Sequence, residues 1–164
     1  LYFRRKGIED FVEVARRMPD VRFIWLGSIN LWLIPRKIRD LVLYNHPENV
    51  EFPGYFKGAV FQGAMSGSDA FLFPSYEETE GIVVLEALAS GQHVVLRDIP
   101  VYNGWIDEES AELCHNVDEF VESLRKVLDG KVDKREAGYR VAESRSIDDV
   151  ALQLVKAYQT VLEM

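Results

Sequence analysis

The stretch that decides the fold is FLFPSYEETEGIVVLEALASG, residues 71–91. Its apolar start is typical of a buried strand, which we expect over residues 69–75. A polar loop, YEETE, follows, and from Gly81 the pattern changes to a helix of apolar and small residues that ends at Gly91. Strand, loop and helix in this order predict one unit of a parallel α/β sheet. Ligands of such sheets bind at the carboxyl ends of the strands, so this loop is the first candidate for a site.

Strand-like and helix-like patterns alternate over the rest of the chain. We expect further strands at 21–28, 49–54, 93–98 and 111–117, the last at a sheet edge, and helices at 8–18, 35–44, 56–68, 118–129, 133–144 and 146–164. Ser146 and Asp149 have the spacing of a capping box for the final helix. The predicted fold class is α/β, a Rossmann-like doubly wound parallel sheet with helices on both faces, in one domain over residues 1–164. Because the chain begins with LYFRRKG, in what reads as the middle of a strand, we expect it to be part of a longer protein.

Composition excludes several functions. The 164 residues are 48 % hydrophobic and carry a net charge of −8, which indicates a folded domain that does not bind nucleic acid through its charge. The single cysteine, Cys114, is expected to be buried in a strand and fits a cytoplasmic setting. The sequence has no G-x-G-x-x-G fingerprint, no D-x-D pair and no histidine spacing that suits a metal, so neither a metal nor a resident cofactor is expected. It also has no apolar run long enough to span a membrane.

Glu86 stands alone in an apolar helix, which raises the question of what its carboxylate binds. We expect that helix to be buried, and burying an unpaired carboxylate is costly. Two partners remain open: a buried Arg or Lys, or the two hydroxyls of a ribose. Glu78 lies eight residues earlier and could accept from a second polyhydroxyl group. Between the two glutamates, the free amides of Gly81, Ile82 and Val83 attract an anion, and Gly81 has no Cβ to obstruct it. The pattern indicates a nucleotide-sugar, with a diphosphate between ribose and hexose.

A basic turn supports this hypothesis. Arg4, Arg5 and Lys6 precede Gly7 between an expected first strand and the first helix, at another strand carboxyl end. Such a cluster could clamp a diphosphate, Lys6 in particular. The alternative is a solvated basic turn with no ligand.

These segments together resemble the retaining family 4 glycosyltransferases of GT-B fold. Glu78 and Glu86 match the E-x7-E motif of that family. The segment PSYEETEGIVVLEALAS, with RDIPVY at 97–102, is similar to the bacterial members that glucosylate diacylglycerol, and RKGIEDF resembles the entry to the family's first helix. The resemblance covers the whole chain. It implies that Glu78 holds the donor hexose, Glu86 the ribose diol and Lys6 the diphosphate.

The sequence also departs from the family pattern. Leu1 stands where the family has a phosphate-binding arginine, so Arg4 or Arg5 would have to replace that contact. The family commonly has E-G-F-G where this chain has E-T-E-G at residues 78–81, so Glu80 departs from the pattern and its role stays open. The family's base-binding region corresponds to FPGYF, where the backbone of Gly54 and Tyr55 is expected to pair with uracil.

The resemblance implies the C-terminal, donor-binding domain of a hexosyltransferase, inactive alone because the N-terminal acceptor domain is absent. The implied reaction transfers glucose from UDP-glucose, with retained configuration and without a metal, to a membrane glycolipid precursor such as diacylglycerol. The alternatives are another donor, GDP-mannose or UDP-galactose, or a non-catalytic flavodoxin-like module with Glu86 in an internal ion pair. Residues 31–44 combine Trp32 with basic residues, so peripheral contact with the inner face of the cell membrane is a further hypothesis, against plain packing on the sheet.

Overall fold

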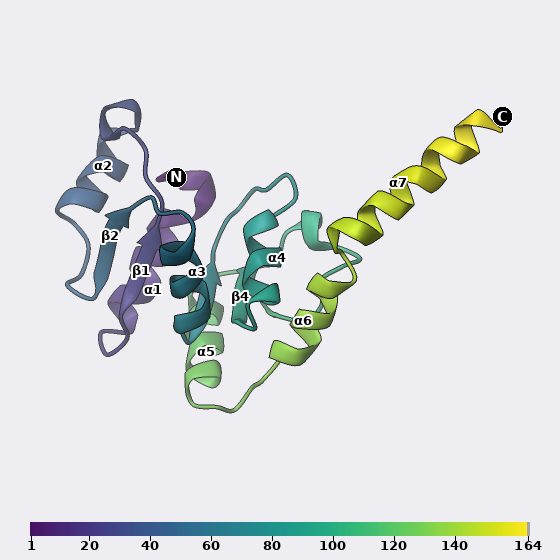
Figure 1. The fold of residues 1–164 in the computed structure, drawn as a ribbon. Helices are drawn as coiled ribbons and strands as arrows, with labels where there is room; N and C mark the ends of the chain where they lie inside the picture. The colour runs from purple at the N-terminus through teal and green to yellow at the C-terminus, as the bar shows by residue number, and fades with distance from the viewer. Residues whose placement is uncertain (164) are drawn as a thin grey trace.

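The computed structural model describes residues 1–163 of the chain, and Figure 1 shows how its helices and strands are arranged. The five strands are β1 Phe23–Leu26, β2 Val50–Gly54, β3 Ala70–Phe73, β4 His93–Arg97 and β5 Glu112–Cys114. The seven α-helices are α1 Ile8–Arg17, α2 Arg36–Leu43, α3 Ala59–Gly67, α4 Ile82–Ala89, α5 Val117–Leu128, α6 Arg135–Glu143 and α7 Ile147–Leu162. Three short 3-10 turns are η1 Arg4–Lys6, η2 Leu31–Leu33 and η3 Pro100–Tyr102.

Every strand pair among these residues is parallel, so the predicted α/β fold class is confirmed. The strands are divided between a two-stranded sheet, β1-β2, and a three-stranded sheet, β3-β4-β5. As expected, β5 lies at an edge, because within residues 1–163 it pairs with β4 alone.

Strand β4 shows how the helices cover both faces of the sheet. Its side chains alternate, as the pleat requires. Val95 packs in a core cluster with Phe11 of α1 and Phe120 of α5. Val94 and Leu96 pack instead in a second cluster, with residues of α4 and η3. The first cluster also contains Phe23 and Val50 of the two-stranded sheet, so the two sheets share one core.

The expected first strand is wrong, and two other elements are less buried than the core strands. Residues 1–3 form no strand, and the basic residues that follow them make the turn η1. Ile24 in β1 is exposed, so β1 is only half-buried. Helix α3, which was expected at 56–68, has Met65 as its one buried residue. Its small side chains offer little apolar area to bury, so only the larger Phe61 and Met65 reach the core.

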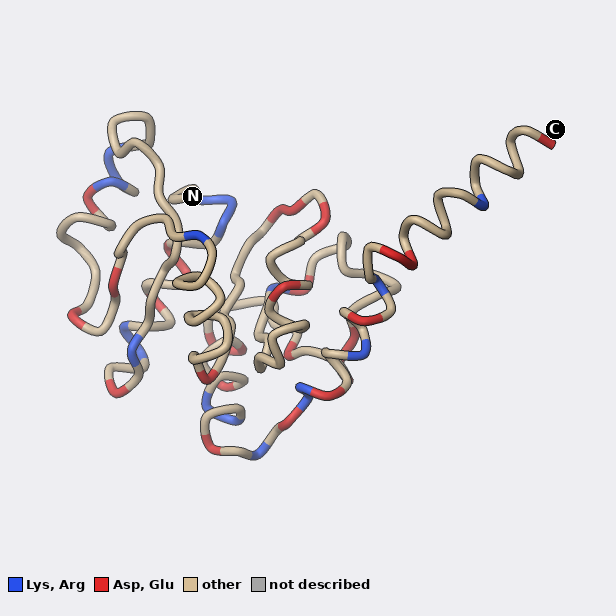
Figure 2. Tube along the Cα trace, in the orientation of Figure 1, with Lys and Arg blue, Asp and Glu red and all other residues tan. Residues whose placement is uncertain are grey.

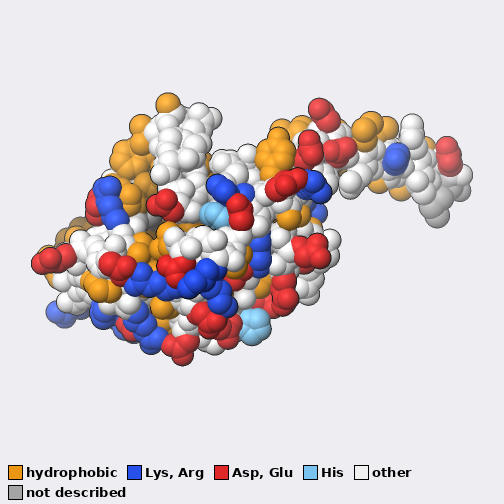
Figure 3. All heavy atoms as spheres, turned by 90° about the horizontal axis from the view of Figure 1, so that it is seen from below, with side chains coloured by type: hydrophobic (Ala, Val, Ile, Leu, Met, Phe, Trp, Pro, Cys, Tyr) orange, Lys and Arg blue, Asp and Glu red, His pale blue; other side chains and the backbone are white. Residues whose placement is uncertain are grey.

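Helix α7 continues beyond the folded body of the chain. Each of its residues is exposed, and Figures 1 and 3 show it projecting away from the rest of the molecule. Ser146 caps it as predicted, accepting a hydrogen bond from the Asp149 amide at 3.2 Å. The carboxylate of Asp149 accepts from the Ser146 hydroxyl at 2.6 Å, which adds a second bond between the two residues.

Candidate functional site

The turn η1 is held against the carboxyl end of β3. Gly7 has φ of +73°, and a Cβ there would lie 2.1 Å from the carbonyl oxygen of Pro74, so only glycine fits this contact. The Arg5 carbonyl accepts hydrogen bonds from the Tyr76 amide at 2.8 Å and the Ser75 hydroxyl at 3.2 Å. The K-G pair therefore fixes Lys6 beside the loop that follows β3.

This contact brings two predicted site residues together. Lys6 Nζ lies 2.5 Å from Glu78 Oε1, although 72 residues separate them in the sequence. The same carboxylate oxygen accepts from Ser75 Oγ at 2.7 Å. The Glu78 side chain is 9 % exposed, so its charge is largely removed from water and depends on these two donors. Ser75 was not predicted as a site residue. Its position at the end of the expected strand 69–75, directly before the polar loop, could have indicated it.

The amino end of α4 lies directly after this loop. None of the hydrogen bonds described for residues 1–163 uses the amides of Gly81, Ile82 or Val83, so these donors are free, as predicted. The structure adds a second reason for glycine at position 81. Its φ is +82°, and a Cβ would lie 3.0 Å from the Tyr102 ring, so the missing Cβ leaves room for that tyrosine. Closer approach of a phosphate to the Gly81 backbone stays a prediction.

Tyr102 is a residue that the sequence did not single out. Its hydroxyl is buried and has no hydrogen-bond partner within residues 1–163. Burial, and then the negative charge of Glu78, raise the pKa of Tyr102. The phenol therefore stays protonated, next to the glycine at which α4 begins.

Glu86 is the clearest correction to the sequence-based expectations. It was expected to be buried, but it lies on the exposed side of α4 together with Ile82, one helical turn earlier. Within residues 1–163, no ion pair or hydrogen bond involves its carboxylate. The helix buries Val84, Ala87 and Leu88 on its other side. Glu86 therefore needs no internal partner, and residues 1–163 do not contain the internal ion pair that the flavodoxin-like alternative required.

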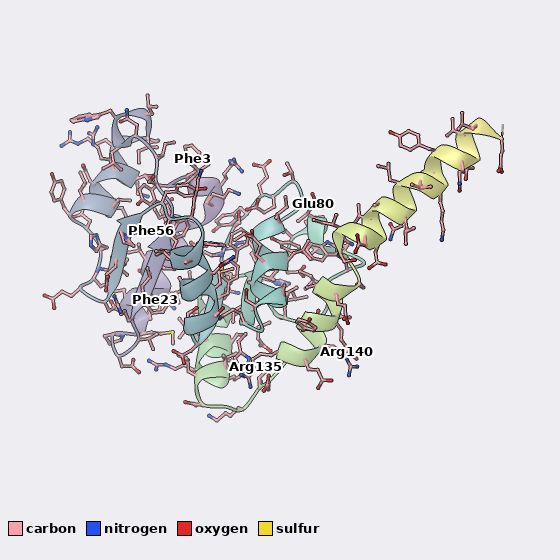
Figure 4. All side chains as sticks on the ribbon, in the orientation of Figure 1. Phe3, Phe23, Phe56, Glu80, Arg135 and Arg140 are labelled. Atoms are coloured by element: carbon pink, nitrogen blue, oxygen red, sulfur yellow. The ribbon has the colours of Figure 1, made fainter. Side chains whose placement is uncertain are left out.

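The remaining predicted residues lie at the same carboxyl ends. Gly54 ends β2, and its carbonyl already accepts the Gly27 amide at 2.8 Å, so pairing with a base would use the other groups of this segment. Tyr55 is 65 % exposed. Arg5 and Glu80 are exposed, and Figure 4 labels Glu80 in the loop before α4. Figure 2 shows that acidic residues gather in that loop.

Arg97 is a second residue whose role only the structure reveals. It is buried, and it donates to the carbonyls of Pro74 at 3.2 Å and His115 at 2.6 Å while pairing with Asp10. Its guanidinium also lies 3.8 Å from the centroid of the Tyr76 ring. Arg97 thus ties the ends of two strands to α1, which positions the loop that carries Glu78.

Two further features of residues 1–163 concern ligands and membranes. No group of three or more His, Cys, Asp or Glu side chains is placed to hold a metal ion in this part of the chain. None of its helices combines the length and hydrophobicity that a transmembrane span requires.

Known structures share this fold. Sucrose-phosphate synthase from Thermosynechococcus elongatus superposes with a TM-score of 0.83 at 22 % identity, over 99 % of this chain and 44 % of that one. The pneumococcal O-GlcNAc transferase GtfA, solved with UDP and GlcNAc, superposes with a TM-score of 0.76 at 17 % identity, over 99 % of this chain and 35 % of that one. The fold is therefore that of a GT-B glycosyltransferase lobe.

Sequence comparison narrows this class. A family model described as glycosyl transferases group 1 matches residues 1–130, and the chain belongs to this family. It is 49 % identical over 166 residues to the processive diacylglycerol alpha-glucosyltransferase of Acholeplasma laidlawii, covering all of this chain and 50 % of the relative. It is also 32 % identical over 101 residues to the alpha-galactosylglucosyldiacylglycerol synthase of Streptococcus pneumoniae, covering 60 % of this chain and 27 % of the relative. The chain thus spans half or less of the length of these two relatives.

Proposed function

We propose that the chain is the donor-binding lobe of a retaining glycosyltransferase that transfers glucose from UDP-glucose to a lipid acceptor such as diacylglycerol. The observation that carries the proposal is the meeting of Lys6 and Glu78 beside the free amides at the start of α4. The 49 % identity to a diacylglycerol glucosyltransferase supports the glucose donor and the lipid acceptor. In this proposal a second lobe supplies the acceptor site, and the enzyme works as a peripheral membrane protein on the cytoplasmic side.

The proposed role of Lys6 follows from its charge and position. When a nucleotide-sugar binds, its diphosphate competes with Glu78 for the ammonium group, and the α4 amides add further donors. Both then stabilise the negative charge that develops on the departing UDP. Positioning and charge stabilisation of this kind require no metal in the proposal.

The proposed role of Glu78 follows from the same exchange. Lys6 and Ser75 both donate to Oε1, so once Lys6 turns to the diphosphate the carboxylate keeps its bond from Ser75 and gains an acceptor position for hexose hydroxyls. Glu86 is proposed to hold the ribose diol; its exposure on α4 leaves it accessible. Tyr55 and Gly54 are proposed to contact the base, and Arg5 to assist at the diphosphate.

Calorimetric titration with UDP, GDP and UDP-glucose tests the proposal. Lys6→Met should weaken UDP binding by about 2 kcal/mol, as the loss of a charged hydrogen bond does. Lys131→Met is the matched control, since that exposed lysine pairs with Asp129, two residues earlier, and with no residue of the proposed site. Glu78→Ala should leave UDP affinity intact or raise it, because Lys6 is released, while the preference for UDP-glucose over UDP declines. If neither uridine ligand binds, or if Lys6→Met and Lys131→Met behave alike, the proposal is wrong.

A galactose donor is the second candidate. It is favoured by the 32 % identity to a synthase named for a galactosylglucosyl lipid. The same titration with UDP-galactose decides between the two sugars, because the donor that binds more tightly than UDP alone identifies the hexose that Glu78 accepts.

A further inference from the structure

The segment around α2 carries exposed side chains that the core does not need. The inner side of the segment is satisfied, because Ile34, Ile38 and Val42 are buried against the sheet. Trp32 and Leu33, in η2, are nevertheless 80 % and 74 % exposed, and Tyr44, directly after α2, is 75 % exposed. Trp32 and Tyr44, with Leu43, border a groove over the outer side of α2. We call this surface, with the basic residues described next, the α2 patch.

The exposed apolar residues are held in place. The Asn30 side chain accepts a hydrogen bond from the Trp32 amide at 3.0 Å, and the Asn30 carbonyl accepts from the Leu33 amide at 2.9 Å. The Arg39 guanidinium lies 4.9 Å from the centroid of the Trp32 ring, within the range of a cation–π contact. Two large apolar side chains are thus presented to solvent by a capped turn.

Basic groups surround these residues. Arg36, Lys37 and Arg39, less Asp40, give segment 31–44 a net charge of +2, within a chain whose net charge is −8. The side chains of Arg36 and Lys37 are 85 % and 82 % exposed, whereas their acidic partners Asp40 and Glu9 are 32 % and 26 % exposed. Cations therefore lie outermost and carboxylates lie below them.

We propose that the α2 patch docks on the surface of an anionic phospholipid bilayer. Trp and Tyr side chains favour the headgroup level of a membrane, and adjacent Lys and Arg side chains are attracted by anionic lipid. The inference rests on the proposed function, since a diacylglycerol acceptor stays in the bilayer. The patch is also suitably placed: η2 follows the carboxyl end of β1, the same end of the strands at which the N-terminal turn η1 and the start of α4 lie (Figure 1).

Helix α7 is the other large apolar surface, and its charge distinguishes it from the α2 patch. Tyr158 and Val161 are 64 % and 68 % exposed, and orange side chains are visible along α7 in Figure 3. Residues 147–163 carry Asp148, Asp149 and Glu163 against Lys156, a net charge of −2. An anionic bilayer repels this helix, so it provides a matched control.

Vesicle flotation tests the proposal. The chain is mixed with phosphatidylcholine vesicles, with or without phosphatidylglycerol, at low and at high salt. We expect it to float with the anionic vesicles at low salt only. The double variant Trp32→Ser with Leu33→Ser should lower the partition coefficient at least tenfold, while Tyr158→Ser with Val161→Ser should leave it unchanged. Arg36→Gln with Lys37→Gln should lower it roughly 25-fold, at about fivefold for each basic residue near the surface.

A second readout identifies the residue that enters the bilayer. Trp32 is the exposed one among the three tryptophans, so brominated lipid should quench part of the tryptophan emission in the parent chain and none of it in Trp32→Phe, which keeps an apolar ring and should still float. Unchanged thermal unfolding confirms that the variants fold.

Three results would overturn the proposal. The first is no flotation with anionic vesicles, and the second is an equal loss of flotation in the α2 and α7 double variants. The third is a dimer, detected by sedimentation, that Trp32→Ser separates into monomers while the variant still floats. UDP titration is independent of these outcomes. If UDP binds and vesicles do not, the docking surface is wrong and the donor site stands; if vesicles bind and UDP does not, the proposed function fails.

Discussion

Gly7→Ala is the substitution whose effect can be calculated most directly from the structure. The backbone at Gly7 has φ of +73°, where an alanine costs roughly 1–2 kcal/mol. The new Cβ would also lie 2.1 Å from the carbonyl oxygen of Pro74, a backbone atom that cannot rotate away. Overpacking of this kind costs typically another 1–3 kcal/mol. We therefore expect the free energy of unfolding to fall by about 2–5 kcal/mol.

Gly130→Ala separates the two contributions. Gly130 has φ of +67°, but a Cβ there meets nothing within 4 Å, so only the backbone cost of about 1–2 kcal/mol applies. Urea unfolding followed by tryptophan fluorescence measures both variants, with equal slopes confirming the same transition. Gly7→Ala should also weaken UDP binding, since it displaces the turn that carries Lys6. Equal destabilisation by the two substitutions would refute the contact with Pro74 as the reason for glycine at position 7.

Three further predictions concern single side chains. Arg97→Met should lower the free energy of unfolding by roughly 3–5 kcal/mol in urea titration, because it leaves Asp10 without its buried partner, and a loss within about 0.5 kcal/mol would contradict the role given to Arg97. Glu86→Gln should weaken UDP binding by about 1–3 kcal/mol in calorimetry and change stability by less than about 0.5 kcal/mol, because the carboxylate is exposed; unchanged UDP affinity would remove Glu86 from the site. Burial raises the pKa of the Cys114 thiol from 9.0 to about 11. The unfolded thiol loses its proton first, so stability should decline between about pH 9 and pH 11, and Cys114→Ala should reduce that decline in urea titrations across this range.

Much of the fold could be predicted from the sequence because its signals are local. Short apolar runs and helical periodicity placed each strand and helix to within a few residues, since both depend on neighbours along the chain. The K-G pair and the ETEG loop were likewise recognisable as strand-end turns. The sequence did not explain why residue 7 must be glycine, because the atom that excludes a Cβ belongs to Pro74, far away in sequence.

The sequence by itself determined which residue types stand at the strand ends, and only the tertiary structure decided which of them meet and which face water. The Lys6–Glu78 pair depends on two turns docking across the end of β3, a contact without periodic signal. The burial of Glu86 was predicted wrongly and the exposure of Trp32 was left open, both for the same reason. A helix that is apolar nearly all round does not reveal which side the core covers, and a turn beside a packed helix does not reveal whether its side chains are enclosed. Burial is a property of the neighbours that fold over a residue, and these neighbours are set by the assembled sheets and helices.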